Sequence, residues 1–429
     1  MNTPRRIART LAIGLFLVPP LAAQEPEPRP ITLDEAMELF ATNNLELRLA
    51  RAEAAEAAGL ARQAAAYPNP VLSGSHEPVS GGGQSYSETY LNLSQRLEWP
   101  GVRGSRRAAA DRAAAAARAR LASDSARLAF EVKRVYTDAA RAAAVVSVLE
   151  RVTAVFREGA ASASARYEEG DLSRYDFRRI RVERTRYENR LAEARLEAAA
   201  ARRRLATLVA PGADALELAP ADGLAGSPPG VELMRALDRA MASRPELTAA
   251  ESALASSQAG ADAVRGERIP TLTATGGYKT QSDGFAGVFL GLSLPVPLWD
   301  RRAGAVEAAG ARVTAAESRA TLVRRQVVTD VRQAVETYRS LQARAALLEA
   351  PADRGLAEDS GDLLEMARVA YAEGELELIE LLDAAEALLD AEAAAARLRA
   401  ALWIGYYDVE RAVGGLDGPG NDENEGEDR

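Results

Sequence analysis

Few residues in this chain have types that could carry out chemistry. The sequence contains one histidine, His76, and no cysteine. Thiol catalysis, disulfides and a transition-metal site of the usual composition within one chain are therefore excluded, which leaves only a site shared by His76 of several subunits. No nucleotide-binding glycine motif or serine elbow occurs in a suitable context, since Gly81-Gly82-Gly83 lies in a predicted loop. Carboxylates are common on predicted helix faces, and no pair stands out as acid and base. We predict no catalysis, no cofactor and no metal site.

Composition points to long helices instead. Hydrophobic residues make up 47% of the chain, but only 5% of residues are aromatic, and the balance is largely alanine. Alanine-rich sequence with interspersed charges is typical of long packed helices. The formal net charge of −9 argues against nucleic acid as a partner.

The N-terminal residues resemble an export signal. Arg5, Arg6 and Arg9 precede a short apolar run, and small residues before Gln24 suit cleavage by signal peptidase. We predict a signal peptide over 1–23; the alternative is a stable N-terminal membrane anchor, for which the apolar run is too short. Because cysteine is absent, lipidation of a mature N-terminal cysteine is excluded.

The chain contains an internal duplication. Three landmarks recur in the same order about 200 residues later: Ile31–Ala36 and Val231–Ala236, Leu91–Ser94 and Leu290–Ser293, Tyr167–Leu172 and Tyr371–Leu376. We therefore predict a first repeat over 31–210 and a second over 231–414. A Pro/Gly-rich linker over 211–230 joins them, and 415–429 is predicted to be a disordered acidic tail.

Each repeat predicts the same elements. Helical residues over 33–66 and 233–268 end at prolines. Period-two alternation then predicts short strands, at about 71–76 and 88–97 in the first repeat and at about 272–278 and 287–294 in the second. Sustained apolar heptads predict coiled-coil hairpins over 101–209 and 301–413, with a kink at Pro351 and Gly355. About 65 residues of helix would extend roughly 100 Å, so the molecule is expected to be elongated.

Four strands are too few to close a transmembrane barrel, which needs about eight or more, and an open sheet edge cannot face lipid. Other subunits would have to complete the sheet. Three copies would supply twelve strands, although this arithmetic does not by itself choose three copies over four.

In this order of elements the chain resembles the TolC family of outer-membrane efflux proteins, over about 31–414. Three motifs further resemble its cobalt–zinc–cadmium resistance branch: Tyr67-Pro68-Asn69-Pro70, the run LSQRLEWPGVR at 93–103 and the run LSLPVPLWDRR at 292–302. The resemblance implies a homotrimer with a twelve-stranded outer-membrane β-barrel in the lipid, continuous with an α-helical periplasmic tunnel. It also implies a periplasmic adaptor protein and an inner-membrane pump of the resistance-nodulation-division class as partners.

The resemblance also assigns roles to residues at the two hairpin tips. Adaptor docking falls on Tyr167, Glu169, Gly170, Asp171, Leu172 and Ser173, and on Tyr371, Glu373, Gly374, Glu375 and Leu376. In each tip a glycine permits the reversal and an exposed leucine is expected to offer an apolar contact. A periplasmic gate of like charges falls on Glu380, Asp383 and Asp176. The alternatives are turn residues with a hydrophobic staple and an ordinary solvated helix face.

We therefore predict an outer-membrane channel subunit of a tripartite efflux system, with heavy-metal cations as cargo. The same fold could serve drug efflux or type I protein secretion. A soluble periplasmic coiled-coil scaffold or adaptor is the alternative from another class, but it would be expected to carry one hairpin rather than two matching halves.

Overall fold

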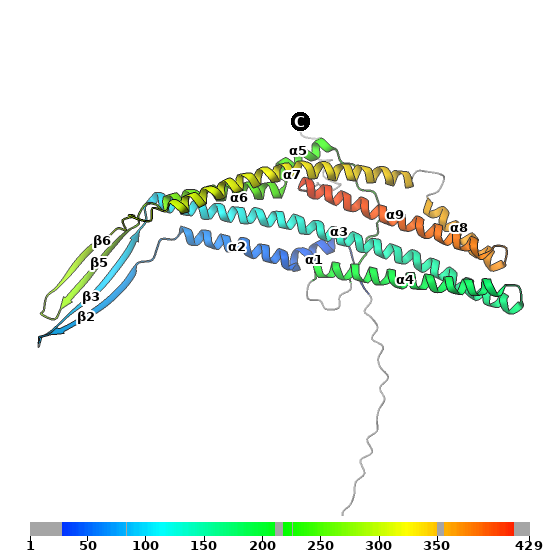
Figure 1. Cartoon of the computed structure of the whole chain (residues 1–429), viewed down its shortest axis with the longest axis horizontal. Helices are drawn as coiled ribbons and strands as arrows, with labels where there is room; N and C mark the ends of the chain where they lie inside the picture. The colour runs from blue at the N-terminus through cyan, green and yellow to red at the C-terminus, as the bar shows by residue number, and fades with distance from the viewer. Residues whose placement is uncertain (1–27, 83, 211–217, 225, 350–355, 416–429) are drawn as a thin grey trace, which may run out of the picture.

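The computed structural model describes residues 28–82, 84–210, 218–224, 226–349 and 356–415. The predicted signal peptide, part of the predicted linker, the predicted kink at Pro351 and Gly355 and the tail beyond residue 415 lie outside the described residues. The described chain is elongated, with a four-stranded sheet at one end and two helical hairpin tips at the other (Figure 1).

Both halves repeat one order of elements: two short helices, two strands and a long helical hairpin. The first half contains α1 (Leu33–Asn43), α2 (Leu45–Ala65), β2 (Val71–Gly81), β3 (Gln84–Leu97), α3 (Pro100–Glu169) and α4 (Arg174–Val209). The second contains α5 (Leu233–Ser243), α6 (Pro245–Gly266), β5 (Leu272–Gln281), β6 (Ala286–Ser293), α7 (Ala303–Glu349), α8 (Leu356–Glu373) and α9 (Leu378–Val413). The predicted mainly helical, duplicated fold is confirmed.

The longest helix, α3, holds the two halves together. It runs for 70 residues from Pro100, which suits the first helical position because its missing N–H would be unpaired there anyway. Most of its predicted heptad positions are buried: Leu128, Val135, Ala142, Leu149 and Phe156. Along its length α3 packs against α2 and α4 of its own half and against α6 and α9 of the other.

The first helical segment of each half is broken in two, which the sequence pattern did not indicate. In the first half Asn44 leaves the helical conformation (ψ 126°), accepts from the backbone N–H of Leu47 at 2.9 Å and donates to the carbonyl of Leu208 at 2.9 Å. In the second half Arg244 occupies the same place, and Pro245 after it disfavours helical geometry there.

A further small sheet was not predicted. Strand β1 (Arg29–Ile31) pairs in parallel with β4 (Leu218–Pro220). Strand β4 lies inside the predicted linker over 211–230. Ile31 and Leu218 are buried in a core with α1, α3 and α4, which explains why three residues suffice to hold each strand in place.

The main sheet is antiparallel in the order β2-β3-β5-β6. Strands β2 and β5 extend past the predicted ends, to Gly81 and Gln281. Pro78 lies within β2, and this is possible because β2 is an edge strand, where a missing N–H breaks no ladder bond. The pairing of β3 with β5 joins the two halves. Strands β2 and β6 each have one unpaired edge in the described structure.

The sheet has two different faces. Directly opposed residues share a face, so the register separates an apolar face from a polar one. The apolar face carries exposed Leu72, Leu91, Leu93, Tyr278, Val288, Leu290 and Leu292. The polar face carries Glu77, Glu88, Tyr90, Asn92, Ser94, Thr275 and Lys279. Leu290 is 90% exposed, so the described residues leave the apolar face uncovered.

Apolar side chains of the helical body gather in three cores. One lies near the hairpin tips between α3, α4, α8 and α9, a second between α5, α7 and α9, and a third around α1, α3 and β4. Within the described ranges, no helix combines the length and the apolar character needed to cross a membrane.

Candidate functional site: the paired hairpin tips

Each tip is closed by a glycine. Gly170 follows α3 and Gly374 follows α8, with φ of 88° and 83°. The next residue, Asp171 or Glu375, donates its backbone N–H to a carbonyl five residues earlier, at 2.8 Å in both tips. A side chain in this left-handed conformation would cost about 1–2 kcal/mol, which explains why glycine stands at both positions.

Two of the three predicted gate residues lie at the start of the returning helices. Ser173 precedes α4: its hydroxyl accepts from the backbone N–H of Asp176 at 3.1 Å and donates to the carboxylate of Asp176 at 2.6 Å. Before α9, the carboxylate of Glu380 accepts from the backbone N–H of Glu377 at 2.9 Å. A carboxylate in the first helical turn is favoured by the helix dipole. Asp176 and Glu380 thus have a local role in starting their helices.

No basic side chain among the described residues neutralises the three predicted gate residues. Glu380 and Asp383 are exposed and Asp176 is half-buried. Among the described residues, none of the three forms an ion pair. One chain holds one copy of each, so a ring of like charges around an axis stays a prediction.

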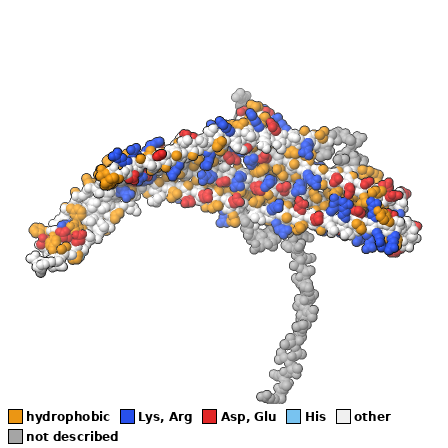
Figure 2. Space-filling model, in the orientation of Figure 1, with side chains coloured by type: hydrophobic (Ala, Val, Ile, Leu, Met, Phe, Trp, Pro, Cys, Tyr) orange, Lys and Arg blue, Asp and Glu red, His pale blue; other side chains and the backbone are white. Residues whose placement is uncertain are grey.

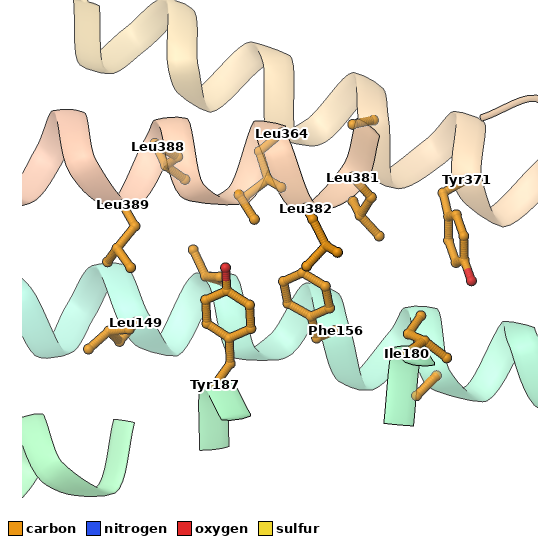
Figure 3. Close-up of a cluster of buried hydrophobic side chains, with 14 of the residues drawn as sticks. Leu149, Phe156, Ile180, Tyr187, Leu364, Tyr371, Leu381, Leu382, Leu388 and Leu389 are labelled. Atoms are coloured by element: carbon orange, nitrogen blue, oxygen red, sulfur yellow. The ribbon is translucent and has the colours of Figure 1, made fainter. Parts of the chain in front are cut away.

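A common core lies under both tips. Figure 3 shows side chains of α3, α4, α8 and α9 meeting between the hairpins, with Phe156 and Tyr187 facing Leu382. The Phe156 and Tyr187 rings are stacked, with centroids 4.5 Å apart. Burial of this apolar surface couples the hairpin of the first half to that of the second.

Arg166 ties one tip directly to the other. Its guanidinium donates to the carbonyl of Tyr371 at 3.1 Å and lies 5.9 Å from the centroid of the Tyr371 ring. A methyl group on Gly374 would come within 3.0 Å of the same guanidinium. Arg166 does not stand out in the sequence, because its counterpart in the second repeat is Ala370 and the two repeats therefore share no residue there.

The predicted docking residues divide into buried and exposed groups. The expectation of an exposed leucine is wrong in both tips, since Leu172 and Leu376 are half-buried against the tip core. Tyr371 is 3% exposed, and this burial raises the pKa of its hydroxyl, an effect that nearby Arg166 partly opposes. Tyr167 is 38% exposed and stacks on Phe177 at 4.7 Å. The other exposed residues are mostly acidic: Glu169, Gly170, Asp171, Ser173, Glu373, Gly374 and Glu375.

The motif at 93–103 lies far from the tips, where the sheet meets the helices. Trp99 donates its indole N–H to the carbonyl of Pro270 at 2.8 Å. Arg103 donates to the carbonyl of Ala65 at 2.7 Å and covers the ring of Tyr67 at 3.6 Å. The motif therefore caps the end of α2 and fixes the junction between strand and helix, and its role is structural.

The distribution of charged side chains differs between the helical body and the outer end of the sheet. Figure 2 shows acidic and basic side chains mixed along the helical body, whereas acidic side chains gather with apolar ones at the outer end of the sheet. Across the described residues, no group of three His, Asp or Glu side chains is arranged to hold a metal ion.

Comparison with known proteins agrees with this geometry. The family model for outer membrane efflux proteins matches residues 236–415. The fold matches the Campylobacter jejuni CmeC outer membrane channel, with a TM-score of 0.74, 16% identity and coverage of 89% of this chain and 85% of that one. It also matches the open Neisseria gonorrhoeae MtrE outer membrane channel, with a TM-score of 0.70, 22% identity and 89% coverage of both.

The second half of the chain therefore resembles the outer membrane efflux protein family. One relative is the cobalt-zinc-cadmium resistance protein CzcC of Cupriavidus metallidurans, which is 28% identical to this chain over 276 residues. That alignment covers 64% of this chain and 65% of CzcC, slightly less than two thirds of the relative. Both matched structures are outer membrane channels, in agreement with the predicted lack of catalysis.

Proposed function

We propose that this chain is the outer-membrane channel subunit of a tripartite efflux system, that it acts as a passive conduit, and that heavy-metal cations are its cargo. The observation that carries the proposal is the four-stranded sheet. Its apolar face is exposed and its edge strands β2 and β6 are unpaired in the described chain. A lipid surface would cover the apolar face, and neighbouring subunits would pair the edges.

Three copies would form a closed sheet of twelve strands with the polar face on the inside. The long helical hairpins would extend this sheet as a tube. The first test is the mass of the detergent-solubilised, signal-cleaved protein by light scattering, corrected for bound detergent. We expect three subunits. A monomer that stays soluble without detergent would contradict the proposal and favour a periplasmic scaffold.

The hairpin tips are proposed to dock a periplasmic adaptor, which in turn engages an inner-membrane pump of the resistance-nodulation-division class. The exposed tip residues are largely acidic, so the docking surface of the adaptor should be basic. Glu169→Gln with Glu375→Gln should weaken pull-down of the co-expressed adaptor, and more so at low salt. The matched control is Glu38→Gln with Glu53→Gln, two exposed carboxylates on α1 and α2, which should leave capture unchanged.

The acidic residues after the second tip are proposed to close the periplasmic end. Replacing Glu380 and Asp383 by Ser should raise or alter the conductance of the trimer in planar bilayers, because a ring of like charges is removed. Since Glu380 also caps α9, Asp383→Ser alone separates gating from local folding. Unchanged conductance and ion selectivity in both variants would remove these residues from the gate.

Metal cargo is proposed from the similarity to a cobalt–zinc–cadmium resistance protein over 276 residues. Deletion of the gene should increase sensitivity to zinc, cobalt or cadmium, and expression of the intact gene should restore tolerance. Unchanged metal tolerance together with drug hypersensitivity would contradict the metal assignment while leaving the channel proposal in place.

A further inference from the structure

One carboxylate on the polar face of the sheet is enclosed by partners. Glu88 of β3 receives Lys279 of β5 at 2.7 Å and the side-chain amide of Gln281 at 2.7 Å. The hydroxyl of Tyr86 donates to it at 2.8 Å, and the hydroxyl of Tyr90 donates to its other oxygen. Four donors thus hold one carboxylate, and its charge is cancelled by a single ammonium.

The enclosure lies where the two repeats meet. Glu88 and Gln281 are directly opposed in the register of β3 and β5, as are Tyr90 and Lys279. Lys279 also lies 5.2 Å from the centroid of the Tyr90 ring, which adds a cation–π contact. The ammonium is therefore fixed over Glu88 and is not a freely moving surface charge.

A second carboxylate on the same face lacks such a partner. Glu77 of β2 is directly opposed to Glu88 across the strand pair. It is exposed, and no ion pair to it occurs within the described part of the chain. Carboxylates at directly opposed positions repel each other, and the ammonium of Lys279 beside Glu88 reduces this repulsion of Glu77.

We propose that the Glu88–Lys279 pair cancels its own charge and thereby leaves Glu77 to set ion selectivity at the outer end of the channel. This inference rests on the proposed function, since it needs the polar face to line a closed conduit. Three chains would then present a ring of three Glu77 carboxylates, which raises the local concentration of cations. Lys279 is a specificity-determining residue in this arrangement because it decides how many negative charges the ring contains.

The test is a charge cycle read as the cation-to-anion permeability ratio, from reversal potentials of the trimer in planar bilayers under a KCl gradient. Glu77→Gln should lower the ratio by roughly twofold or more. Lys279→Met should raise it by a similar factor, because the negative charge of Glu88 is then no longer neutralised. Glu88→Gln should lower the ratio because Lys279 is left unpaired. The double variant Glu88→Gln/Lys279→Met should return to the wild-type value.

Salt provides a second readout. All shifts should shrink as KCl rises from about 0.1 M to about 1 M, since the screening length falls from roughly 10 Å to roughly 3 Å. A purely structural role for the pair would give no selectivity change of opposite sign in the two single variants. If Lys279→Met fails to assemble as a trimer, Glu77→Gln, which leaves the enclosure intact, decides the question.

The outcomes separate the two proposals. A conducting wild-type channel whose selectivity is unchanged by Glu77→Gln would overturn this inference alone. A wild-type protein that never conducts would overturn the channel function and this inference with it. Opposite shifts in Lys279→Met and Glu88→Gln, cancelled in the double variant, would support both.

Discussion

Two buried tyrosines show how much the surroundings of one residue type differ within this fold. The hydroxyl of Tyr338 on α7 donates to the carbonyls of Pro228 and Pro229, each at 2.9 Å, and so holds the chain that leads into α5. The hydroxyl of Tyr371 in the tip core is buried with no hydrogen-bond partner among the described residues. The same substitution should therefore have different effects at the two sites.

We expect Tyr338→Phe to lower the free energy of unfolding by about 1–2 kcal/mol, because the carbonyls of buried Pro228 and exposed Pro229 lose their donor. Tyr371→Phe is the matched control and should be neutral or stabilising, since it removes an unpaired polar group. Midpoints of denaturant unfolding for the detergent-solubilised protein would report both. Equal losses in the two variants would contradict this reading.

Tyr338 should also make the stability of the folded protein depend on pH in the alkaline range. Burial raises the pKa of Tyr338 to about 12, above its usual value near 10. The folded protein therefore keeps a proton that the unfolded chain releases, and the resulting stability is complete below pH 10 and is lost as pH rises toward 12. Tyr338→Phe should show a smaller fall in melting temperature between pH 9.5 and pH 11 than the wild type.

The tip glycines give a second comparison between equivalent residues. Gly170→Ala and Gly374→Ala should both pay the cost of the left-handed conformation. Gly374→Ala should lose about 1 kcal/mol more, because its methyl group displaces Arg166 from the Tyr371 carbonyl, whereas nothing lies within 4 Å of the corresponding position at Gly170. Thermal melting of both variants in the Arg166→Ala background should remove the difference.

At the scale of elements, the paired short helices depend on the residue between them. Asn44→Ala removes the cap of α2 and the bond to Leu208, and we expect a loss of about 1–2 kcal/mol. Neighbouring Asn43 is the control and should tolerate alanine, because it ends α1 and its side chain makes no hydrogen bond within the described chain. Hydrogen exchange should show faster opening of the first turn of α2 in Asn44→Ala only.

Element types were predictable because their patterns are long and periodic. The heptads of α3 and the alternation in β3 and β6 indicated the correct elements, and the repeat of landmarks indicated two equivalent halves. The break at Asn44 was missed because two hydrogen bonds of its side chain decide it, whereas the break at Arg244 is marked in the sequence only by the proline that follows it. Strands β1 and β4 were missed because three residues give no period, and their pairing joins segments nearly 190 residues apart.

The tip site was only partly predictable for a similar reason. The glycines and acidic residues stand out in the sequence, but burial of Leu172, Leu376 and Tyr371 arises from packing between the two halves. Arg166 makes a contact in one repeat that has no equivalent in the other. Comparison of the two repeats therefore identified the residues that they share but not the residues at which they differ.

At the scale of the whole molecule, pairing of β2 with β6 of a neighbouring copy can be measured directly. The chain contains no cysteine, so Ser75→Cys on β2 can be combined in turn with cysteines along β6 without background. Mild oxidation of outer membranes should give dimer and trimer bands for the one or two β6 positions that lie opposite Ser75. The single variant Ser75→Cys should stay monomeric on the denaturing gel.

The uninterrupted course of α3 has one more consequence. A helix of 70 residues between the sheet and the tip acts as a ruler, because each residue adds about 1.5 Å to the reach of the molecule. Adding seven residues to each helix of both hairpins near the tips would lengthen the reach by about 10 Å and keep nearly the same helix faces in contact. Chains of this design can therefore be matched to envelopes of different depth by whole heptads, with neither the sheet nor the tips redesigned.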